Sequence, residues 1–345
     1  MTHAIRFILL ASLVLVLGAP ASGQSASAPA TQPAGTQPVA KDAQEVLLTS
    51  GRQAFALRLN QDWLAAWPVW MWMASQCEEM PPRSQGLFLA MDDCKPVLGG
   101  THLLVTSSRG GAALVKRADN TCAFYAESVN AHSAELVRDR WIVVCSSIRG
   151  DELQVFNRFD ENRPATKLAA IPLAAAHGVV YDWRGQVLWA LGDKELLKTK
   201  IVEGKGDEPV RIDVLNRYPL PSRGGHDLFP YFHYKQPAGK TPDTAKGLFV
   251  TVWEGVYVFD LASEKFDPFE PLANQGNVKS ITDNLRTGQI VYQRPQGQQN
   301  FSAEVKFLSP TEVRALPPKI GVYPTQIYKT RWNQPNPFSY QQDSK

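Results

Sequence analysis

Five basic side chains recur along the sequence, each at the start of a short apolar run or just inside one. They are Lys95, His132, His177, His226 and Lys279, separated by 37, 45, 49 and 53 residues. Three imidazoles that converge on one point can hold a divalent metal such as zinc or manganese. A lysine amine can bind an anionic group, or act as a base where burial lowers its pKa. The spacing therefore predicts one site assembled from distant parts of the chain.

Three arginines follow apolar runs in related segments. Arg52 lies in LLTSGRQ, Arg109 in VTSSRGG and Arg149 in VCSSIRG. The planar guanidinium matches the geometry of carboxylate, sulfate and phosphate groups. We therefore expect these arginines to help bind an anionic ligand.

Two carboxylates lie close in sequence to the histidines. Glu135 follows His132 by three residues, and Asp227 is next to His226. They are candidates to contact the ligand, to ligate the metal or to orient an imidazole. If the protein is an enzyme, the candidate catalytic residues are Lys95, Lys279 and His177.

Each of these sets also has a structural explanation. Polar residues at a repeated position can hydrogen-bond backbone groups of neighbouring repeats, and the histidines would then hold the fold together. A single arginine in a turn is commonly a solvated surface residue. Trp63, Trp67, Trp70 and Trp72 could stack on sugar rings, but VWMWMAS is more typical of an outer strand.

The candidate residues occupy one place in a repeat, in which a polar residue precedes an apolar run, a turn and a second apolar run. Two more short apolar runs follow in each unit. Four strands per unit of about 40 to 50 residues is typical of a β-propeller blade. The copies are DDCKPVLGGTHLLVTSSRGG, NAHSAELVRDRWIVVCSS, AAHGVVYDWRGQVLWALGD, GGHDLFPYF with KGLFVTVWEG, and NVKSITDNLRTGQIVYQRP.

The first copy supplies only three strands, EVLLTSG, QAFALRL and VWMWMAS, while an extra segment, QIYKTRWN, follows the last copy. We infer that this C-terminal segment completes the first blade and closes the ring, which removes open sheet edges. The predicted fold is an all-β, six-bladed β-propeller over residues 43–333. Five or seven blades and a β-sandwich remain as alternatives.

The first strand of a blade is innermost and runs along the central channel. The His and Lys residues that begin the first strands should therefore ring the channel at one face. The second strand returns to that same face, which places the three arginines around the ring. This geometry predicts a cationic channel mouth.

These segments resemble an uncharacterised family of secreted bacterial β-propeller proteins, classed as a domain of unknown function. The resemblance rests on KPVLGGTHLLVTSS, AHSAEL, AHGVVYD with LWALGD, GHDLFPY, and VKSI with TGQIVY, and it covers about Val46 to Trp332. It implies a propeller fold and bacterial export, but no established activity. Cys94 departs from the pattern, which has an aliphatic residue there.

The ends of the chain differ from its middle in composition. Residues 1–23 have the basic start, apolar run and small residues of a cleaved signal peptide. A Pro/Ala/Ser/Thr/Gln linker over 24–42 is expected to be disordered, and 334–345 is expected to be a polar tail. We therefore expect export to the bacterial periplasm or the extracellular space. Of the four cysteines, Cys77 and Cys94 are the favoured disulfide pair.

The formal net charge of the 345-residue chain is +3 and its basic residues are scattered, which gives no support for nucleic acid binding. Motifs of zinc proteases, α/β-hydrolases and nucleotide-binding loops are missing from the sequence. The sequence favours a monomer without a membrane span after signal cleavage. It is expected to bind an anionic ligand, such as a uronate-containing or sulfated glycan, at the channel mouth, with or without a divalent metal.

Two other functions stay open. One is a carbohydrate-active enzyme, either a hydrolase or a metal-dependent polysaccharide lyase in which a Lys or His removes the C5 proton of a uronate. The other is a non-enzymatic propeller that binds a protein partner or has a structural role. In that case the histidines would be structural.

Overall fold

The computed structural model describes residues 44–59, 66–204, 208–233, 235, 244–297, 299–308, 313–316 and 326–340. All of them belong to one compact unit, Val39–Lys345. The predicted signal peptide and linker lie outside the described residues, as do positions 341–345 of the predicted tail. No helix within the described ranges is long and apolar enough to cross a membrane.

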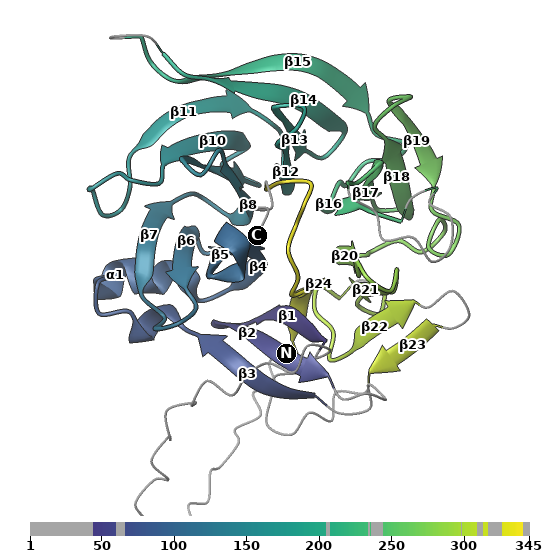
Figure 1. Cartoon of the computed structure of the whole chain (residues 1–345), viewed down its shortest axis with the longest axis horizontal. Helices are drawn as coiled ribbons and strands as arrows, with labels where there is room; N and C mark the ends of the chain where they lie inside the picture. Colours follow the sequence, from purple (N-terminus) through teal and green to yellow (C-terminus); the bar gives the residue numbers. More distant parts are fainter. Residues whose placement is uncertain are drawn as a thin grey trace, which may run out of the picture. The chain divides into compact units, whose positions relative to one another are not determined.

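Six antiparallel four-stranded sheets are arranged around a common axis, which confirms the six-bladed β-propeller (Figure 1). From the axis outward, blade 1 consists of β24 (Ile327–Trp332), β1 (Glu45–Ser50), β2 (Gln53–Leu59) and β3 (Ala66–Trp72). Blade 2 consists of β4 (Met91–Val97), β5 (His102–Ser107), β6 (Gly111–Lys116) and β7 (Cys122–Glu127). Blade 3 consists of β8 (Ala131–Val137), β9 (Trp141–Ser146), β10 (Glu152–Asn157) and β11 (Lys167–Pro172).

The other three blades follow the same plan. Blade 4 consists of β12 (Gly178–Asp182), β13 (Val187–Leu191), β14 (Glu195–Val202) and β15 (Arg211–Pro219). Blade 5 consists of β16 (Asp227–Tyr231), β17 (Gly247–Thr251), β18 (Val256–Asp260) and β19 (Lys265–Pro268). Blade 6 consists of β20 (Ser280–Asp283), β21 (Ile290–Gln293), β22 (Val305–Leu308) and β23 (Val313–Leu316).

Within the described ranges, helical structure is confined to short segments around blade 2. Between β3 and β4 lie a 3₁₀ turn (Ala74–Gln76), the helix α1 (Pro82–Gln85) and a second 3₁₀ turn (Gly86–Phe88). A third 3₁₀ turn, Leu98–Gly100, connects β4 to β5.

The burial of the strands follows their distance from the axis. Every residue of the inner strand β8 is buried, whereas the outer strand β11 is mostly exposed. Apolar side chains fill the space between neighbouring blades, as where Val143 and Leu153 of blade 3 pack in one cluster with Val179 of blade 4. The inner strands of blades 4 and 5 come so close that a Cβ on Gly178 would lie 2.6 Å from Leu228 Cβ.

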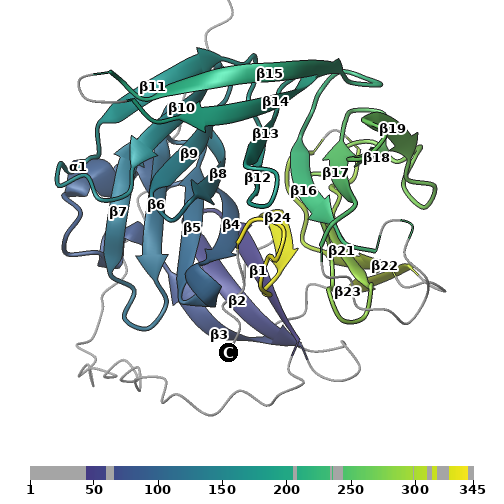
Figure 2. The ribbon, with the colours of Figure 1, turned by 45° about the horizontal axis from the view of Figure 1, so that its top comes forward.

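The C-terminal strand closes the ring as the sequence predicts. β24 pairs antiparallel with β1, with Val46 opposite Trp332 and Leu48 opposite Thr330. It also contacts the inner strands β4 and β20 on either side, and Figure 2 shows it among the inner strands of the other blades. Trp332 is buried beside Phe307 of blade 6, so the closing strand adds an apolar contact as well as backbone hydrogen bonds.

Residues 334–340 differ from the expectation of a polar tail. They cross the ring at the end of the channel where the inner strands terminate (Figure 1). Trp183 Nε1 donates to the Pro337 carbonyl at 3.0 Å, and Phe338 is buried in the cluster between blades 4 and 5. The aromatic side chains of this segment explain why it packs despite its polar composition.

The four cysteines are buried free thiols, so the Cys77–Cys94 disulfide favoured by the sequence does not form. Cys94 lies on the inner strand β4, whereas Cys77 accepts a hydrogen bond from Trp72 Nε1 of the outer strand β3 at 3.0 Å. Burial raises the pKa of the Cys145 thiol to about 12. These thiols therefore pack as small apolar groups.

Candidate functional site

The three predicted histidines meet at one end of the central channel, which we call the channel mouth. The rings of His132 and His177 lie edge to face with centroids 4.1 Å apart. The rings of His177 and His226 are stacked at 5.2 Å. Each histidine stands at or next to the first residue of an inner strand, and this shared place in the blade brings them together.

Backbone carbonyls fix the orientation of two of these rings. His132 Nδ1 lies 3.1 Å from the Asn130 carbonyl oxygen, and His177 Nδ1 lies 2.7 Å from that of Ala175. A protonated Nδ1 that donates to a carbonyl leaves Nε2 as a hydrogen-bond acceptor. Burial, with a further contribution from Lys329, lowers the pKa of His132 to about 3. The imidazole is therefore neutral at physiological pH.

Lys279 also lies at the channel mouth, one residue before β20. Its backbone N–H donates to Gln293 at 2.8 Å, and its side chain is 4% exposed. Burial and the positive charge of Lys329 lower the pKa of the Lys279 amine to about 8. The amine is thus more easily deprotonated than an ordinary surface lysine.

Lys95 does not join the mouth, contrary to the sequence prediction. Its amine lies 3.9 Å from Glu135 and donates to the Val179 carbonyl at 2.8 Å, about three residues deeper along the inner strands. The residue of β4 that lies level with His132 is Asp92, whose Oδ1 is 3.9 Å from His132 Nε2. Asp93 likewise lies level with Ser133, whose hydroxyl donates to it at 3.0 Å.

Asp92 is a site residue that the sequence interpretation missed. It is buried, and the Ser108 hydroxyl donates a short hydrogen bond to its Oδ2. Burial raises the pKa of the Asp92 carboxyl to about 7. A sequence alignment of the second and third repeats that pairs Asp92 with His132 would have identified it. The sequence interpretation paired Lys95 with His132 instead.

Below the mouth, two cations of β24 and two carboxylates form a buried ion-pair network. Arg331 contacts Asp93 through Nε at 2.7 Å and Nη2 at 2.9 Å, and it contacts Asp227 through Nη2 at 2.6 Å. The Lys329 amine donates to Asp227 at 3.1 Å. Burial alone would raise the pKa of Asp227, but Arg331 and Lys329 lower it. Asp227, predicted to contact a ligand or a metal, is thus engaged by these two cations.

Glu135 also lies away from the mouth. Beside its ion pair with Lys95, it accepts a short hydrogen bond from the hydroxyl of Tyr340. Burial raises the pKa of the Glu135 carboxyl, although the Lys95 amine opposes this. Lys95 and Glu135 therefore connect the inner strands to the C-terminal segment, which explains why neither is available at the mouth.

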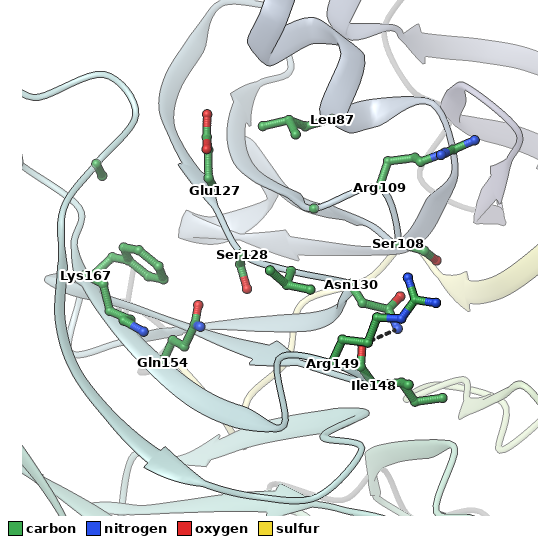
Figure 3. A pocket seen from close by; sticks show the side chains of 14 residues that line it. Leu87, Ser108, Arg109, Glu127, Ser128, Asn130, Ile148, Arg149, Gln154 and Lys167 are labelled. Atoms are coloured by element: carbon green, nitrogen blue, oxygen red, sulfur yellow. Dashed lines mark hydrogen bonds between the residues drawn. The ribbon is translucent and has the colours of Figure 1, made fainter.

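A groove between blades 2 and 3 opens on the same face as the mouth, with a volume of about 710 Å³ (Figure 3). Arg109 of the β5–β6 turn and Arg149 of the β9–β10 turn both line it. No described carboxylate forms an ion pair with either guanidinium. Arg52 occupies the equivalent turn between β1 and β2, where it is exposed but does not line the groove.

Two side-chain oxygen atoms in the wall of the groove lack hydrogen-bond partners among the described residues, although Gln154 Nε2 donates to Glu152 at 2.8 Å. Ser128 is 3% exposed and Gln154 is 6% exposed, and neither Ser128 Oγ nor Gln154 Oε1 has a hydrogen-bond partner. Figure 3 places Gln154 with Lys167 on one side and Arg109 with Ser108 on the other. Buried polar atoms without partners are rare in folded proteins, because each costs free energy. These two are therefore candidates to bind a ligand.

Shared residues connect the groove to the channel mouth. Ser108 lines the groove and donates to Asp92 at the mouth. Asn130 lines the groove and its carbonyl oxygen accepts from His132 Nδ1. The arrangement offers adjacent places for an anionic group and for hydroxyl groups on one face of the propeller.

The same geometry bears on the predicted metal. Among the described residues, no group of three or more His, Cys, Asp and Glu side chains is arranged to hold a metal ion. Lys279 and Lys329 also place positive charge beside the imidazoles. A divalent metal held by His132, His177 and His226 stays a prediction.

Comparison with known proteins agrees with the fold. A family model described as "Family of unknown function (DUF6528)" matches residues 2–345. No curated protein matches the chain. One chain of a nidogen/laminin complex is similar, with a TM-score of 0.56 and 10% identity over 85% of this chain and 99% of that chain.

Two further solved structures are similar to the chain. A putative 6-phosphogluconolactonase from Bacteroides fragilis NCTC 9343 has a TM-score of 0.50 and 9% identity, over 86% of this chain and 99% of that chain. Hydrazine synthase of Kuenenia stuttgartiensis has a TM-score of 0.44 and 13% identity, over 65% of each chain. The match thus spans slightly less than two thirds of the hydrazine synthase chain. At these identities, the likeness to the nidogen/laminin chain and to the putative 6-phosphogluconolactonase shows the fold alone.

Proposed function

The chain belongs to the family of unknown function DUF6528, and from that premise we propose a function on the basis of its own residues. The protein is an exported β-propeller that binds an anionic glycan fragment, carrying uronate or sulfate groups, in the groove between blades 2 and 3. The observation that supports this most is the pair of guanidiniums without ion-pair partners, Arg109 and Arg149, beside two buried polar atoms without partners.

The charge of the groove favours an anion. Lys167 is paired with Glu152 at 2.8 Å, so its charge is largely balanced. The lining contains one further carboxylate, Glu127, and its single negative charge is smaller than the positive charge of the two guanidiniums. The groove thus has a surplus of positive charge, carried by the side chain best suited to bidentate contact with a carboxylate or sulfate.

The rest of the lining suits a sugar. Gln154 Oε1 can accept a hydrogen bond from a hydroxyl group, and Ser128 Oγ can donate or accept one. Val129 and Ile148 are exposed apolar side chains that also line the groove. They can pack against the C–H groups of a pyranose ring, which combines apolar faces with a rim of hydroxyls. A small inorganic anion would leave the apolar part of the groove empty.

Calorimetric titration of the mature protein with trigalacturonate, a sulfated heparin tetrasaccharide and neutral maltotriose tests the proposal. We expect an acidic oligosaccharide to bind and maltotriose not to bind. A hydrogen bond to a charged group contributes about 1.5–3 kcal/mol, so Arg109→Ala and Arg149→Ala should each weaken binding by about tenfold or more. Arg52→Ala is the matched control, because Arg52 lies in the equivalent turn of blade 1, outside the groove.

Equal losses in all three arginine variants would indicate non-specific attraction to a basic face and would contradict the groove. Binding of none of the acidic oligosaccharides would favour a propeller that binds a protein partner or has a structural role. Repeating the titration after treatment with EDTA tests the predicted metal. Loss of affinity on chelation and its recovery with zinc or manganese would support the metal.

A further inference from the structure

We propose that the channel mouth is a second subsite, in which Lys279 and His226 bind the carboxylate and a neighbouring hydroxyl of a terminal uronate. The inference rests on the proposed function for the identity of the ligand, because the groove would hold the rest of the same chain. A free uronic acid nevertheless tests the mouth by itself.

The first support for the subsite is the state of Lys279. Among the described residues, none forms an ion pair or hydrogen bond with its amine, although the side chain is 4% exposed. The other buried cations of the channel all have partners: Lys95 with Glu135, Lys329 with Asp227, and Arg331 with Asp93 and Asp227. A buried cation is costly unless it is paired. Lys279 is therefore the channel cation that a ligand's carboxylate would satisfy.

The second support is His226, which precedes β16 in the blade next to Lys279. Its Nδ1 is buried and forms no hydrogen bond of good geometry with a described residue, unlike Nδ1 of His132 and His177, although the backbone of Gly225 lies close enough to raise the pKa of the ring. Lys279 and His226 each lie one residue before an inner strand, and these two strands, β20 and β16, contact each other. The Lys279 amine and His226 Nδ1 thus lie at the starts of neighbouring strands, and neither forms a hydrogen bond of good geometry with a described side chain.

The remaining groups of the mouth decide which ligand fits. His132 and His177 are neutral and present Nε2 as an acceptor, which suits hydroxyl groups. Lys329 is occupied by Asp227, so one free amine remains, which matches one carboxylate rather than a group with two charges. Ser108 and Asn130 link the mouth to the groove, so a chain end at the mouth could continue into the groove.

Titration of the full mature protein with free D-galacturonate, with D-galactose as the neutral control, tests the subsite. We expect galacturonate to bind at pH 6.5, and Lys279→Met to weaken it by at least tenfold. Lys279→Arg keeps the charge and should restore part of the affinity. Lys198→Met is the matched control, because Lys198 lies on β14, away from the channel, and pairs with Glu264 of the β18–β19 turn. The same comparison is made in the double variant Arg109→Ala/Arg149→Ala, so that any binding of galacturonate to the groove arginines does not mask the effect of Lys279→Met.

The outcomes separate the subsite from the groove. Loss of galacturonate binding on Lys279→Met, both in the wild type and in the double arginine variant, with retention in Lys198→Met, supports the subsite. Unchanged galacturonate binding in Lys279→Met overturns it, and so does a wild-type protein that binds trigalacturonate but no galacturonate at millimolar concentration. In that last case the groove proposal survives. A protein that binds galacturonate but not trigalacturonate would contradict the proposed groove and support the subsite at the channel mouth.

Discussion

Replacing Lys279 by methionine should stabilise the protein, although Lys279 is proposed to bind a ligand. The residue is 4% exposed and its amine forms no ion pair or hydrogen bond with a described residue, so folding removes most of the hydration of the amine, and only the nearby charge of Asp92 compensates in part. Methionine has a stem of similar length and no charge. A residue kept at a cost in stability is typical of functional sites, where activity and stability compete.

The magnitude follows from the pKa of the amine, which folding lowers from 10.5 to about 8. Each pKa unit corresponds to about 1.4 kcal/mol, so the charged form costs up to about 3 kcal/mol of folding free energy near neutral pH. Allowing for relaxation around the amine, we expect Lys279→Met to gain about 1–3 kcal/mol at pH 7.

The sign of the pH dependence distinguishes this effect from better packing. Below pH 8 the amine is protonated in both the folded and the unfolded protein, and its cost is fully present. Between pH 8 and 10.5 the folded protein binds fewer protons than the unfolded one, so the stability of the wild type rises with pH. The advantage of Lys279→Met should therefore shrink by about 1.4 kcal/mol between pH 7 and pH 9.

Urea denaturation of both proteins at pH 7 and pH 9, followed by tryptophan fluorescence, measures these differences. Lys198→Met is the control and should change stability by less than about 0.5 kcal/mol at both pH values, because Lys198 is partly exposed. A Lys279→Met protein that is no more stable than the wild type at pH 7 would refute the reasoning. A gain that is the same at both pH values would assign it to packing instead of charge.

Two further changes test the channel and its far end. Arg331→Met leaves Asp93 and Asp227 with Lys329 as their shared cation, and it should cost about 3–5 kcal/mol. This deficit in urea denaturation should narrow as the pH falls toward 4 and the carboxylates become protonated, and a cost below about 1 kcal/mol would contradict the network. Phe338→Ala should cost about 3 kcal/mol if residues 334–340 pack as described, whereas an unchanged urea midpoint would show them to be a loose tail.

The fold could be predicted from the sequence because its signals are local and repeated. Short apolar runs and turn residues mark each strand, and the count of three runs in the first copy indicated where the C-terminal strand QIYKTRWN belongs. The packing of residues 334–340 could not be predicted, because their composition is polar and two aromatic side chains determine their position.

The site was predicted in part, and the errors have a geometric cause. His132, His177, His226 and Lys279 meet because they share a place in the repeat, whereas Lys95 was aligned by its charge. β4 and β8 each contain an irregularity near their start, between Met91 and Cys94 and between Ala131 and Ser133. Such bulges shift the strand register and leave no clear mark in the sequence.

The charged network on β24 was accessible to sequence reasoning but was not recognised. Lys329 and Arg331 are two positions apart, so on a strand they face the same side. A basic pair on the strand that closes the ring indicates carboxylates across the axis, and Asp93 and Asp227 are those carboxylates. The groove depends on side chains from two blades, and no pattern along one segment contains that information.

The strand that closes the ring also affects the order of folding. β24 is the last of the described strands, and it pairs with β1, the first of them. Until it docks, Asp93 and Asp227 lack the two cations of β24, Lys329 and Arg331, and the repulsion between the carboxylates opposes closure of the ring. When β24 docks, it completes blade 1, and its two cations balance the charges of Asp93 and Asp227 at the same time. Contacts between such distant segments form slowly, so a nascent or shortened chain that lacks this strand should lose the whole ring and not one blade.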